Sequence, residues 1–417
     1  AAMSPCERED ESRPQKSRSS RLASMHSGER FPEHVWGWSR AHWRAEMQGL
    51  GEPAYRGDQL FRWWQQRGVT DPAAMSDVPQ ALRQRLATLP ACRPAAAPQL
   101  LSAHPSTDGT TKLLLGCADG RRLETVLLPE RDRRAPGSRH YTLCVSSQVG
   151  CAVGCVFCAS GLRGLQRHLH AAEIVAQVQQ ARAYLQQQAP SAGRIHRLVF
   201  MGMGEPLHNY VQVREALRIL SDPQGLGLSL RRMVLSTSGL VPQMRQLAAD
   251  FGGQLPLALS LHAADDALRQ QLVPIGRRYP LAEVIAALRD YPLPARERFT
   301  IEYTLIRGIN DTPRHAKAVL RLLEGLPYKV NVIPFNPVPE LDFEAPEPAA
   351  VLAFQTVLRR AGIGAWWRRQ RGDGVAAACG QLALHPDASG HRPPRRPRRG
   401  AVARQDRTPT AVGGRRR

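Results

Sequence analysis

Three cysteines lie close together in the sequence at the spacing C-x3-C-x2-C: Cys151, Cys155 and Cys158. Three thiolates at this spacing can bind one inorganic centre. Zinc normally takes a fourth ligand from a second C-x2-C or a histidine pair, and neither follows at the usual distance. A [4Fe–4S] cluster held by three cysteines keeps one iron open, which suits a cluster that both binds a substrate and carries an electron. The spacing predicts an iron–sulfur cluster, with a zinc site or a purely structural loop as the alternative.

Small and polar residues follow several strand-like runs beyond this loop. In a parallel sheet, ligands bind at the carboxyl ends of the strands. Glycine allows close backbone approach, a glutamate can accept from an ammonium group, and hydroxyl, imidazole and amide groups can bind a ribose, a carboxylate or an adenine edge. Each residue alone fits a tight turn or a local hydrogen bond, but their recurrence on successive strands favours a ligand site. The candidates are Gly204, Glu205, Ser236, Ser260, Leu261, His262 and Asn336.

Two more cysteines and one acid are candidates for chemistry. Cys144 stands in a strand-like run seven residues before the loop, where a buried small hydrophobe is the alternative reading. Cys379 lies among alanines and glycine in AAACG, which would leave its thiol accessible to a bulky partner, although a packed turn would look the same. Glu124 is an isolated acid in an otherwise apolar strand, a pattern more typical of a solvent-facing residue than of a base.

These residues must be positioned by a sheet. From about residue 140 to 372 the strand-like runs TLCVSS, HRLVFMG, RMVLSTS, LALSLH, RFTIEYTLI and KVNVIPF alternate with helical or loop-plus-helix stretches. Six βα units predict an α/β fold with a parallel sheet, either open or closed into a partial barrel. In the first helix, AAEIVAQVQQARAYLQQQ, the residues Ile174, Val178, Ala181 and Leu185 form one apolar stripe that should pack on the sheet.

Composition divides the rest of the chain. Apolar residues at helical spacing between 31 and 90 predict a small helical domain. The runs TTKLLLGC and RRLETVLLPE around the turn ADGR predict a β-hairpin that leads into the main domain. We therefore expect five parts: a disordered tail over 1–29, a helical RNA-binding accessory domain over 30–98, a hairpin and linker over 99–139, a catalytic domain over 140–385, and a disordered Arg-rich tail over 386–417.

The charge of the chain indicates an acidic partner. The 417 residues include 57 Lys and Arg against 36 Asp and Glu, a formal net charge of +21. The Arg-rich tail supplies +8 of this, so the remainder is also basic, which favours nucleic acid. No run of about 18 uncharged apolar residues suggests a membrane span. Because no apolar secretory segment opens the sequence, we expect a cytoplasmic, reducing location, where clustered thiols bind metal or react.

Several motifs occur in an order that resembles one enzyme family. They are CVSSQVGC, the three-cysteine loop, GMGEPL, LSTSG, SLHA, VPI, IEY, NPV and GDGVAAACGQL. Together they resemble the RlmN and Cfr RNA adenine methyltransferases, which are radical S-adenosylmethionine (SAM) enzymes. The resemblance extends into LGEPAYRGDQLFRWW and STDGTTKLLL and covers roughly residues 35–385. It implies a radical SAM partial (β/α)6 barrel with an N-terminal helical accessory domain.

The resemblance also implies a role for each candidate. The three-cysteine loop would hold the [4Fe–4S] cluster, and the strand-end candidates would contact SAM. Cys379 would carry a methyl group, Glu124 would accept a proton, and Cys144 would resolve the covalent intermediate and leave a disulfide bond. The implied partners are RNA, an electron donor for the cluster and a thiol reductant.

The substrate is less closely defined by these motifs. Similarity to RlmN favours C2 of an adenine in 23S rRNA, with tRNA as an open second substrate. The alternatives are C8-directed methylation, as in Cfr, a divergent radical SAM paralogue with another substrate, and a metal-stabilised RNA-binding module without catalysis. The chain departs from the family pattern in a longer, more basic segment between Glu124 and Cys144, in Ala159-Ser160-Gly161, and in Gly276, where asparagine is usual.

Overall fold

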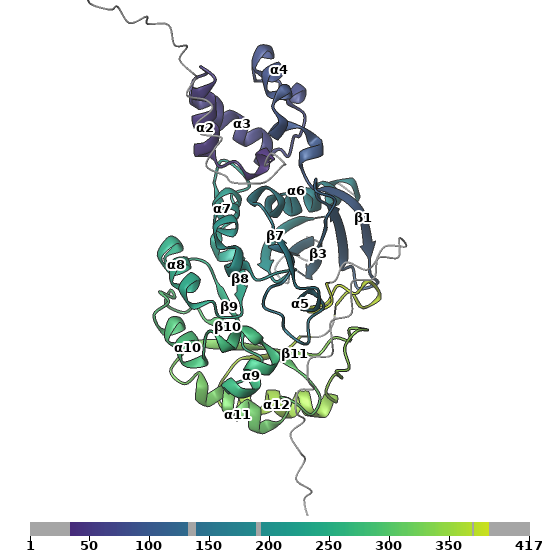
Figure 1. Ribbon diagram of the computed structural model, residues 1–417, viewed down its shortest axis with the longest axis vertical. Helices are drawn as coiled ribbons and strands as arrows, with labels where there is room; N and C mark the ends of the chain where they lie inside the picture. Colours follow the sequence, from purple (N-terminus) through teal and green to yellow (C-terminus); the bar gives the residue numbers. More distant parts are fainter. Residues whose placement is uncertain (1–33, 132–138, 189–192, 369–370, 383–417) are drawn as a thin grey trace, which may run out of the picture.

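The computed structural model describes residues 34–131, 139–188, 193–368 and 371–382. Both predicted tails, 1–29 and 386–417, lie outside the described residues. Helices of the N-terminal part form one end of the molecule, and a sheet covered by helices forms the rest (Figure 1). Among the described residues, no helix is both long enough and apolar enough to cross a membrane.

Ten strands of the described chain form one sheet in the order β1-β2-β3-β4-β7-β8-β9-β10-β11-β12. From β4 to β12 neighbouring strands are parallel, whereas β1 to β4 pair antiparallel. The six predicted βα strands are confirmed as β4, β7, β8, β9, β10 and β11. The bounds are β1 (Gln99–Pro105), β2 (Thr111–Gly116), β3 (Arg122–Arg131), β4 (Arg139–Cys144), β7 (Arg194–Phe200), β8 (Met233–Thr237), β9 (Leu257–Ser260), β10 (Phe299–Leu305), β11 (Tyr328–Pro334) and β12 (Ala365–Trp367).

Helices connect the parallel strands and cover one face of the sheet (Figure 1). They are α6 (Ala171–Gln188), α7 (Tyr210–Ser221), α8 (Val241–Phe251), α9 (Asp266–Leu272), α10 (Leu281–Arg289), α11 (Pro313–Leu322) and α12 (Pro348–Arg360). In α6 the predicted stripe is confirmed, because Ile174, Val178 and Ala181 are fully buried and Leu185 is 5% exposed. A two-stranded sheet of β5 (Gln148–Gly150) and β6 (Leu165–His168) flanks the short helix α5 (Ala159–Arg163).

The N-terminal part contains helices, as its spacing predicts. They are η1 (Val35–Gly37), α2 (Arg40–Gly49), α3 (Tyr55–Phe61), η2 (Arg62–Gln66), η3 (Pro72–Ala74), α4 (Gln80–Thr88), η4 (Pro90–Cys92) and η5 (Pro94–Ala96). Ser39 caps α2 by accepting from the His42 amide, and the rings of Trp43 and Trp64 stack 6.5 Å apart inside the bundle. The side chain of Gln179 on α6 donates to the Gln65 carbonyl, which ties the bundle to the sheet-covering helices.

The predicted hairpin is part of the main sheet and not a separate linker. β2 pairs with β3 through Leu114 opposite Glu124, and β3 pairs onward with β4 through Val126 opposite Cys144. β3 is ten residues long and pairs with β2 on one side and with β4 on the other. Through β3, the strands β1 to β3 extend the parallel sheet in antiparallel orientation. Glu124 and Cys144 therefore lie on neighbouring strands.

Candidate active site

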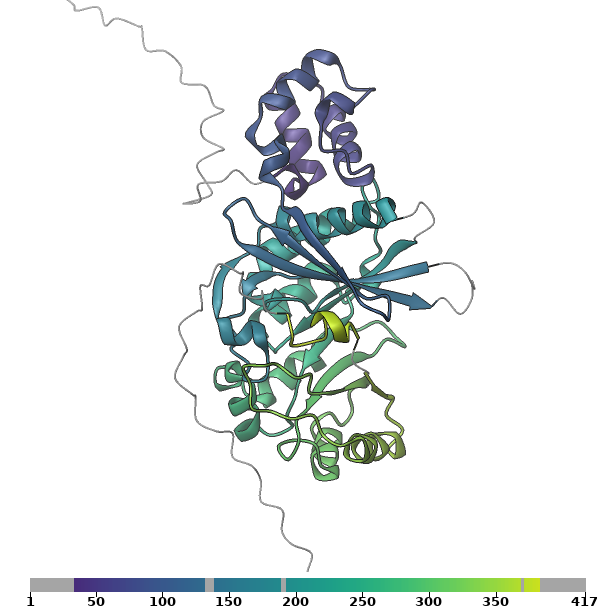
Figure 2. The same ribbon diagram turned by 90° about the vertical axis from the view of Figure 1, so that its right-hand side faces the viewer.

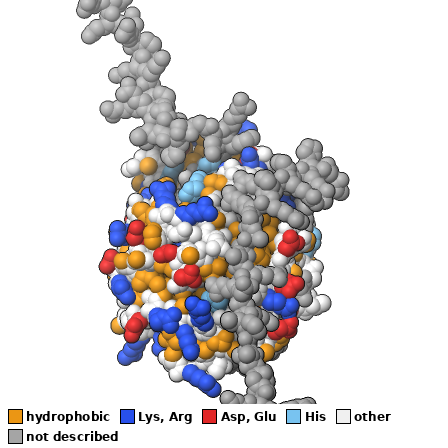
Figure 3. All heavy atoms as spheres, turned by 60° about the horizontal axis from the view of Figure 1, so that its bottom comes forward, with side chains coloured by type: hydrophobic (Ala, Val, Ile, Leu, Met, Phe, Trp, Pro, Cys, Tyr) orange, Lys and Arg blue, Asp and Glu red, His pale blue; other side chains and the backbone are white. Residues whose placement is uncertain are grey.

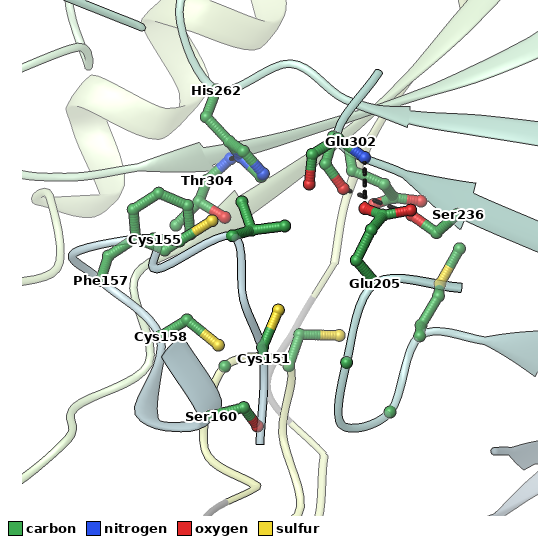
Figure 4. Close-up of a pocket in the computed structure, with 18 of the residues that line it drawn as sticks. Cys151, Cys155, Phe157, Cys158, Ser160, Glu205, Ser236, His262, Glu302 and Thr304 are labelled. Carbon is green, nitrogen blue, oxygen red and sulfur yellow. Dashed lines mark hydrogen bonds between the residues drawn. The ribbon is translucent and has the colours of Figure 1, made fainter. Parts of the chain in front are cut away.

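One pocket opens at the carboxyl ends of β7 to β11, beside the loop between β5 and α5 (Figure 4). It brings together residues that the sequence separates by more than 200 positions. The predicted residues that line it are Cys151, Cys155, Cys158, Gly204, Glu205, Ser236, Ser260, His262, Asn336 and Cys379. Leu261 does not line it: its side chain is fully buried in the core, and its amide donates to the Glu302 carbonyl at 3.0 Å.

The loop that carries the three cysteines is held by backbone hydrogen bonds. The Val156 amide donates to the Leu272 carbonyl at the end of α9, and the Ala159 amide donates to the Gly380 carbonyl at 2.8 Å. The start of the loop requires glycine at 150, because φ is +78° and a Cβ there would lie 1.9 Å from the Gly164 oxygen.

The three thiols fit a cationic centre. Burial, together with repulsion from Cys158, raises the pKa of Cys151 to about 12, and the same causes raise the pKa of Cys155 well above its ordinary value. Burial also raises the pKa of Cys158. Three thiolates could not share this pocket without positive charge between them. Three cysteines on one short loop can hold an inorganic centre that supplies this charge.

At the other end of the pocket, Glu205 is buried and fixed. Its Oε1 accepts from the Leu207 amide at 3.0 Å, and its Oε2 accepts from the Ser238 amide at 2.8 Å. Burial raises the pKa of this carboxyl group, and these hydrogen bonds oppose the shift. The neighbouring Gly204 has φ +102°, and a Cβ there would lie 2.6 Å from the Gln148 side chain. A rigid carboxylate of this kind can bind an ammonium group.

His262 presents a neutral imidazole to the pocket. Its backbone has φ +59°, and its Nδ1 accepts from the Thr304 amide at 3.0 Å. Because burial lowers the pKa of His262 to about 3, the ring is neutral near pH 7 and carries its proton on Nε2. The ring meets Phe157 edge to face, and the hydroxyls of Ser236 on β8 and Ser260 on β9 lie 3.3 Å apart. These groups offer one donor and two hydroxyls to a ligand.

Cys379 reaches the pocket on residues 371–382, which pass between the antiparallel strands and the barrel (Figure 2). Hydrogen bonds hold the backbone of this segment at Cys379 and again at Leu382. Asn336 Nδ2 donates to the Cys379 carbonyl at 2.9 Å, and Ser160 Oγ donates to the Leu382 carbonyl at 2.6 Å. The Cys379 side chain is exposed within the pocket, where loss of solvent and the nearby Glu302 raise the pKa of its thiol to about 11. Cys379 is therefore a thiol, not a thiolate, near pH 7.

Cys144 and Glu124 lie next to this pocket and do not line it. Cys144 is buried among Val126, Met203 and Ala377, so it is packed like a small hydrophobe and also close to the Cys379 segment. Burial, with repulsion from Cys379, raises the pKa of Cys144, and both cysteines are free. Cys144 therefore lies beside the segment that carries Cys379.

The solvent-facing interpretation of Glu124 is wrong. Glu124 is 2% exposed, and its Oε1 lies 3.1 Å from Nζ of Lys112, which is 5% exposed. Both side chains point to the sheet face that Val126 and Cys144 share, and the C-terminal segment covers this face. Glu124 Oε2 has no hydrogen-bond partner among the described residues. A buried carboxylate with one free oxygen can accept a proton.

Sequence reasoning missed several pocket residues, above all Glu302 and Thr304 on β10. Glu302 Oε1 accepts from Asn331 Nδ2 at 2.7 Å, and burial raises the pKa of Glu302. The signal was present in the motif IEY, in which one acid interrupts an apolar strand.

Comparison with known protein families and structures identifies the class of enzyme to which this chain belongs. The family model of the radical SAM superfamily matches residues 145–320, and the model of the ribosomal RNA large subunit methyltransferase N-terminal domain matches residues 35–91. A crystal structure described as a radical SAM methyltransferase from Sphaerobacter thermophilus is 41% identical, with a TM-score of 0.77. The match covers 84% of this chain and 99% of that chain. The fold and the pocket are those of a radical SAM enzyme.

Relatives then give the family. A protein of Sorangium cellulosum named dual-specificity RNA methyltransferase RlmN is 46% identical over 87% of this chain and 97% of its own length. A protein of Marinobacter nauticus with the same name is 44% identical over 84% of this chain and 92% of its own length. The chain belongs to the RlmN family of radical SAM RNA methyltransferases.

Proposed function

We propose that this protein methylates C2 of an adenine in 23S rRNA, with a tRNA adenine as its second substrate. The proposal assigns a [4Fe–4S] cluster to Cys151, Cys155 and Cys158. It assigns SAM to the pocket around Glu205, Ser236, Ser260, His262 and Asn336. One observation carries the proposal. Cys379 lines the same pocket as the three-cysteine loop, although more than 200 residues separate them in the sequence.

Adenine C2 is electrophilic and cannot attack the methyl group of SAM directly. Cys379 therefore first takes a methyl group from one SAM by nucleophilic attack, which requires loss of its thiol proton. A [4Fe–4S] cluster held by Cys151, Cys155 and Cys158 would supply the electron for reductive cleavage of a second SAM, the chemistry that generates a 5′-deoxyadenosyl radical. Cys379 presents the S-methyl group from which that radical removes a hydrogen atom, and the methylene carbon then joins C2.

Release of the product needs two further groups. The adduct must give one electron to an acceptor, a role that the oxidised cluster on the three-cysteine loop would serve. Glu124 then accepts the proton from C2, and Cys144 attacks the sulfur of Cys379. The bond between that sulfur and the methylene carbon breaks, the carbon gains a proton, and the methylated base leaves. The two cysteines remain as a disulfide, which an external thiol reductant must reduce. The contacts of Cys144 with the Cys379 segment and the free Oε2 of Glu124 support these roles.

Charge supports an RNA substrate. Beyond the net charge of +21, Arg314, Lys317 and Arg321 are exposed along one side of α11. Figure 3, which brings this end of the molecule forward, shows Lys and Arg side chains gathered there. Such side chains can bind phosphates without reading bases. The proposal includes a cytoplasmic location, where rRNA, an electron donor and a thiol reductant are available.

Mass spectrometry tests the proposal. Anaerobically reconstituted protein should carry a methyl group on Cys379, and RNA treated with it should contain 2-methyladenosine. A Cys379→Ala variant should give neither, while a Cys92→Ala variant should behave as the wild type, because Cys92 is buried in the N-terminal part, far along the chain from the pocket. Detection of 8-methyladenosine would favour the Cfr-like alternative, and an unmethylated Cys379 in active enzyme would overturn the proposal.

A further inference from the structure

A buried arginine lies behind the cysteine loop. Arg269 on α9 is 0% exposed, and its Nη2 donates to the Ser238 carbonyl at 2.6 Å. Its Nε and Nη1 atoms are buried and have no hydrogen-bond partner among the described residues. A guanidinium group stays protonated even when burial lowers its pKa, and a buried charge is costly unless it is compensated. Some negative group must therefore offset Arg269.

The cysteine loop packs against α9, the helix that carries Arg269 and Asp266. Two thirds of the way along this loop, the Val156 amide donates to the Leu272 carbonyl of α9, and Leu268 packs in one cluster with Val153. These contacts place the helix that carries Arg269 directly against the loop that carries Cys155. Asp266 shares its Oδ1 with the Leu281 amide at 2.9 Å. A thiolate-bound centre on the loop would provide the missing compensation.

Arg269 also reaches the SAM end of the pocket through a single residue, Ser238. The Ser238 carbonyl accepts from Arg269, and the Ser238 amide donates to Glu205 Oε2 at 2.8 Å. The guanidinium group of Arg269 thus holds Ser238 in place, and the amide of Ser238 orients the carboxylate of Glu205. Arg269 does not line the pocket itself, so any effect on a ligand passes through Ser238 and Glu205.

Gly276 leaves one side of the guanidinium open. A Cβ at 276 would lie 3.2 Å from Arg269 Nη1, and the backbone there is not in the left-handed region. Glycine offers Nη1 no side-chain acceptor, and Nη1 has no hydrogen-bond partner among the described residues.

We propose that Arg269 is a positioning residue with two effects: its charge favours the reduced state of the cluster on the Cys155 loop, and its hydrogen bond to Ser238 orients Glu205 for SAM. This inference rests on the proposed function. A positive charge stabilises the state with one more electron, so removing it lowers the reduction potential. A purely structural arginine would leave the potential unchanged.

The first experiment compares Arg269→Met, Arg269→Lys and the exposed control Arg277→Met as reconstituted holoproteins. Iron content, redox titration followed by electron paramagnetic resonance, and equilibrium binding of SAM are measured. In Arg269→Met the ratio of reduced to oxidised cluster at a fixed potential should fall about tenfold, a shift of about 59 mV for one electron. Arg269→Lys should keep the potential but bind SAM more weakly. Arg277→Met should match the wild type.

A second pair of variants keeps Arg269 in place. Gly276→Asp puts a carboxylate against Nη1 and should lower the reduced fraction severalfold, whereas Gly276→Asn has the same shape without charge and should leave it near the wild type. Equal potentials in these two variants, or an unchanged potential in an iron-loaded Arg269→Met, would overturn the inference. A wild-type protein that takes up no iron would instead overturn the proposed function, so the two failures are distinguishable.

Discussion

The ion pair between Lys112 and Glu124 offers a stability test of the buried sheet face. Its atoms lie 3.1 Å apart, and both side chains are less than a tenth exposed. With an effective dielectric constant of about 20, Coulomb's law gives an attraction of about 5 kcal/mol. Removal of one partner from a buried pair leaves an uncompensated charge and costs about 3–5 kcal/mol. We expect Lys112→Met to lower the free energy of unfolding by about this amount.

The assay is urea denaturation of four proteins: the wild type, Lys112→Met, Glu124→Gln, and the double variant. Because the double variant contains no unpaired charge, it should be more stable than Lys112→Met alone, and the cycle should give a coupling energy of several kcal/mol. The exposed pair of Arg307 and Glu344, 2.9 Å apart, is the control, and Arg307→Met should cost less than about 1 kcal/mol. A cost below about 1 kcal/mol for Lys112→Met, or strict additivity in the double variant, would refute the claim that this face is shielded from water.

Four shorter predictions follow from the site and the tail. Cys155→Ala should abolish cluster assembly and SAM cleavage, measured as iron content and 5′-deoxyadenosine; persistent cleavage would contradict the assignment of the loop. Cys144→Ala should still methylate Cys379 but accumulate a protein–RNA adduct on a denaturing gel, which the Cys144→Ala, Cys379→Ala double variant should lack; normal turnover by the single variant would leave Cys144 as a buried hydrophobe. Because the pKa of Cys379 is raised to about 11, the thiolate fraction should rise about tenfold per pH unit above neutrality, and the rate of SAM-dependent methylation of this thiol should rise with it unless a protein base removes the proton. Deletion of residues 386–417 should reduce the salt dependence of RNA binding in a filter-binding assay without changing the methylated adenine, and a changed position would make the tail a specificity element.

The sequence was sufficient to predict those features of the fold and site that depend on nearby residues and on strand order. The apolar stripe of α6 follows from helical spacing, and the meeting of strand-end residues at one edge follows from parallel strand order. The C-x3-C-x2-C spacing was sufficient to single out the cysteine loop. These features need only local periodicity and the topology of βα units.

Tertiary contacts decided the rest. Glu124 looks solvent-facing in its strand because the segment that covers it, around Ala377, comes some 250 residues later. The sequence could not identify Lys112 as the ion-pair partner of Glu124, because the pair depends on the register of β2 and β3. Asn336 lines the pocket and stays a predicted ligand contact. Its Nδ2 also donates to the backbone of Cys379, a contact that spacing could not indicate.

The hydrogen bond from Ser160 to the Leu382 carbonyl joins residues 222 positions apart, and it has a consequence for the order of synthesis. Ribosomes add about 5–20 residues per second. The cysteine loop is therefore synthesised about 10 to 45 seconds before the segment that closes its pocket. During that interval the loop has no Cys379 segment above it. An iron–sulfur carrier that acts on the nascent chain therefore meets an open loop, whereas one that acts on the finished protein must reach it through the pocket mouth.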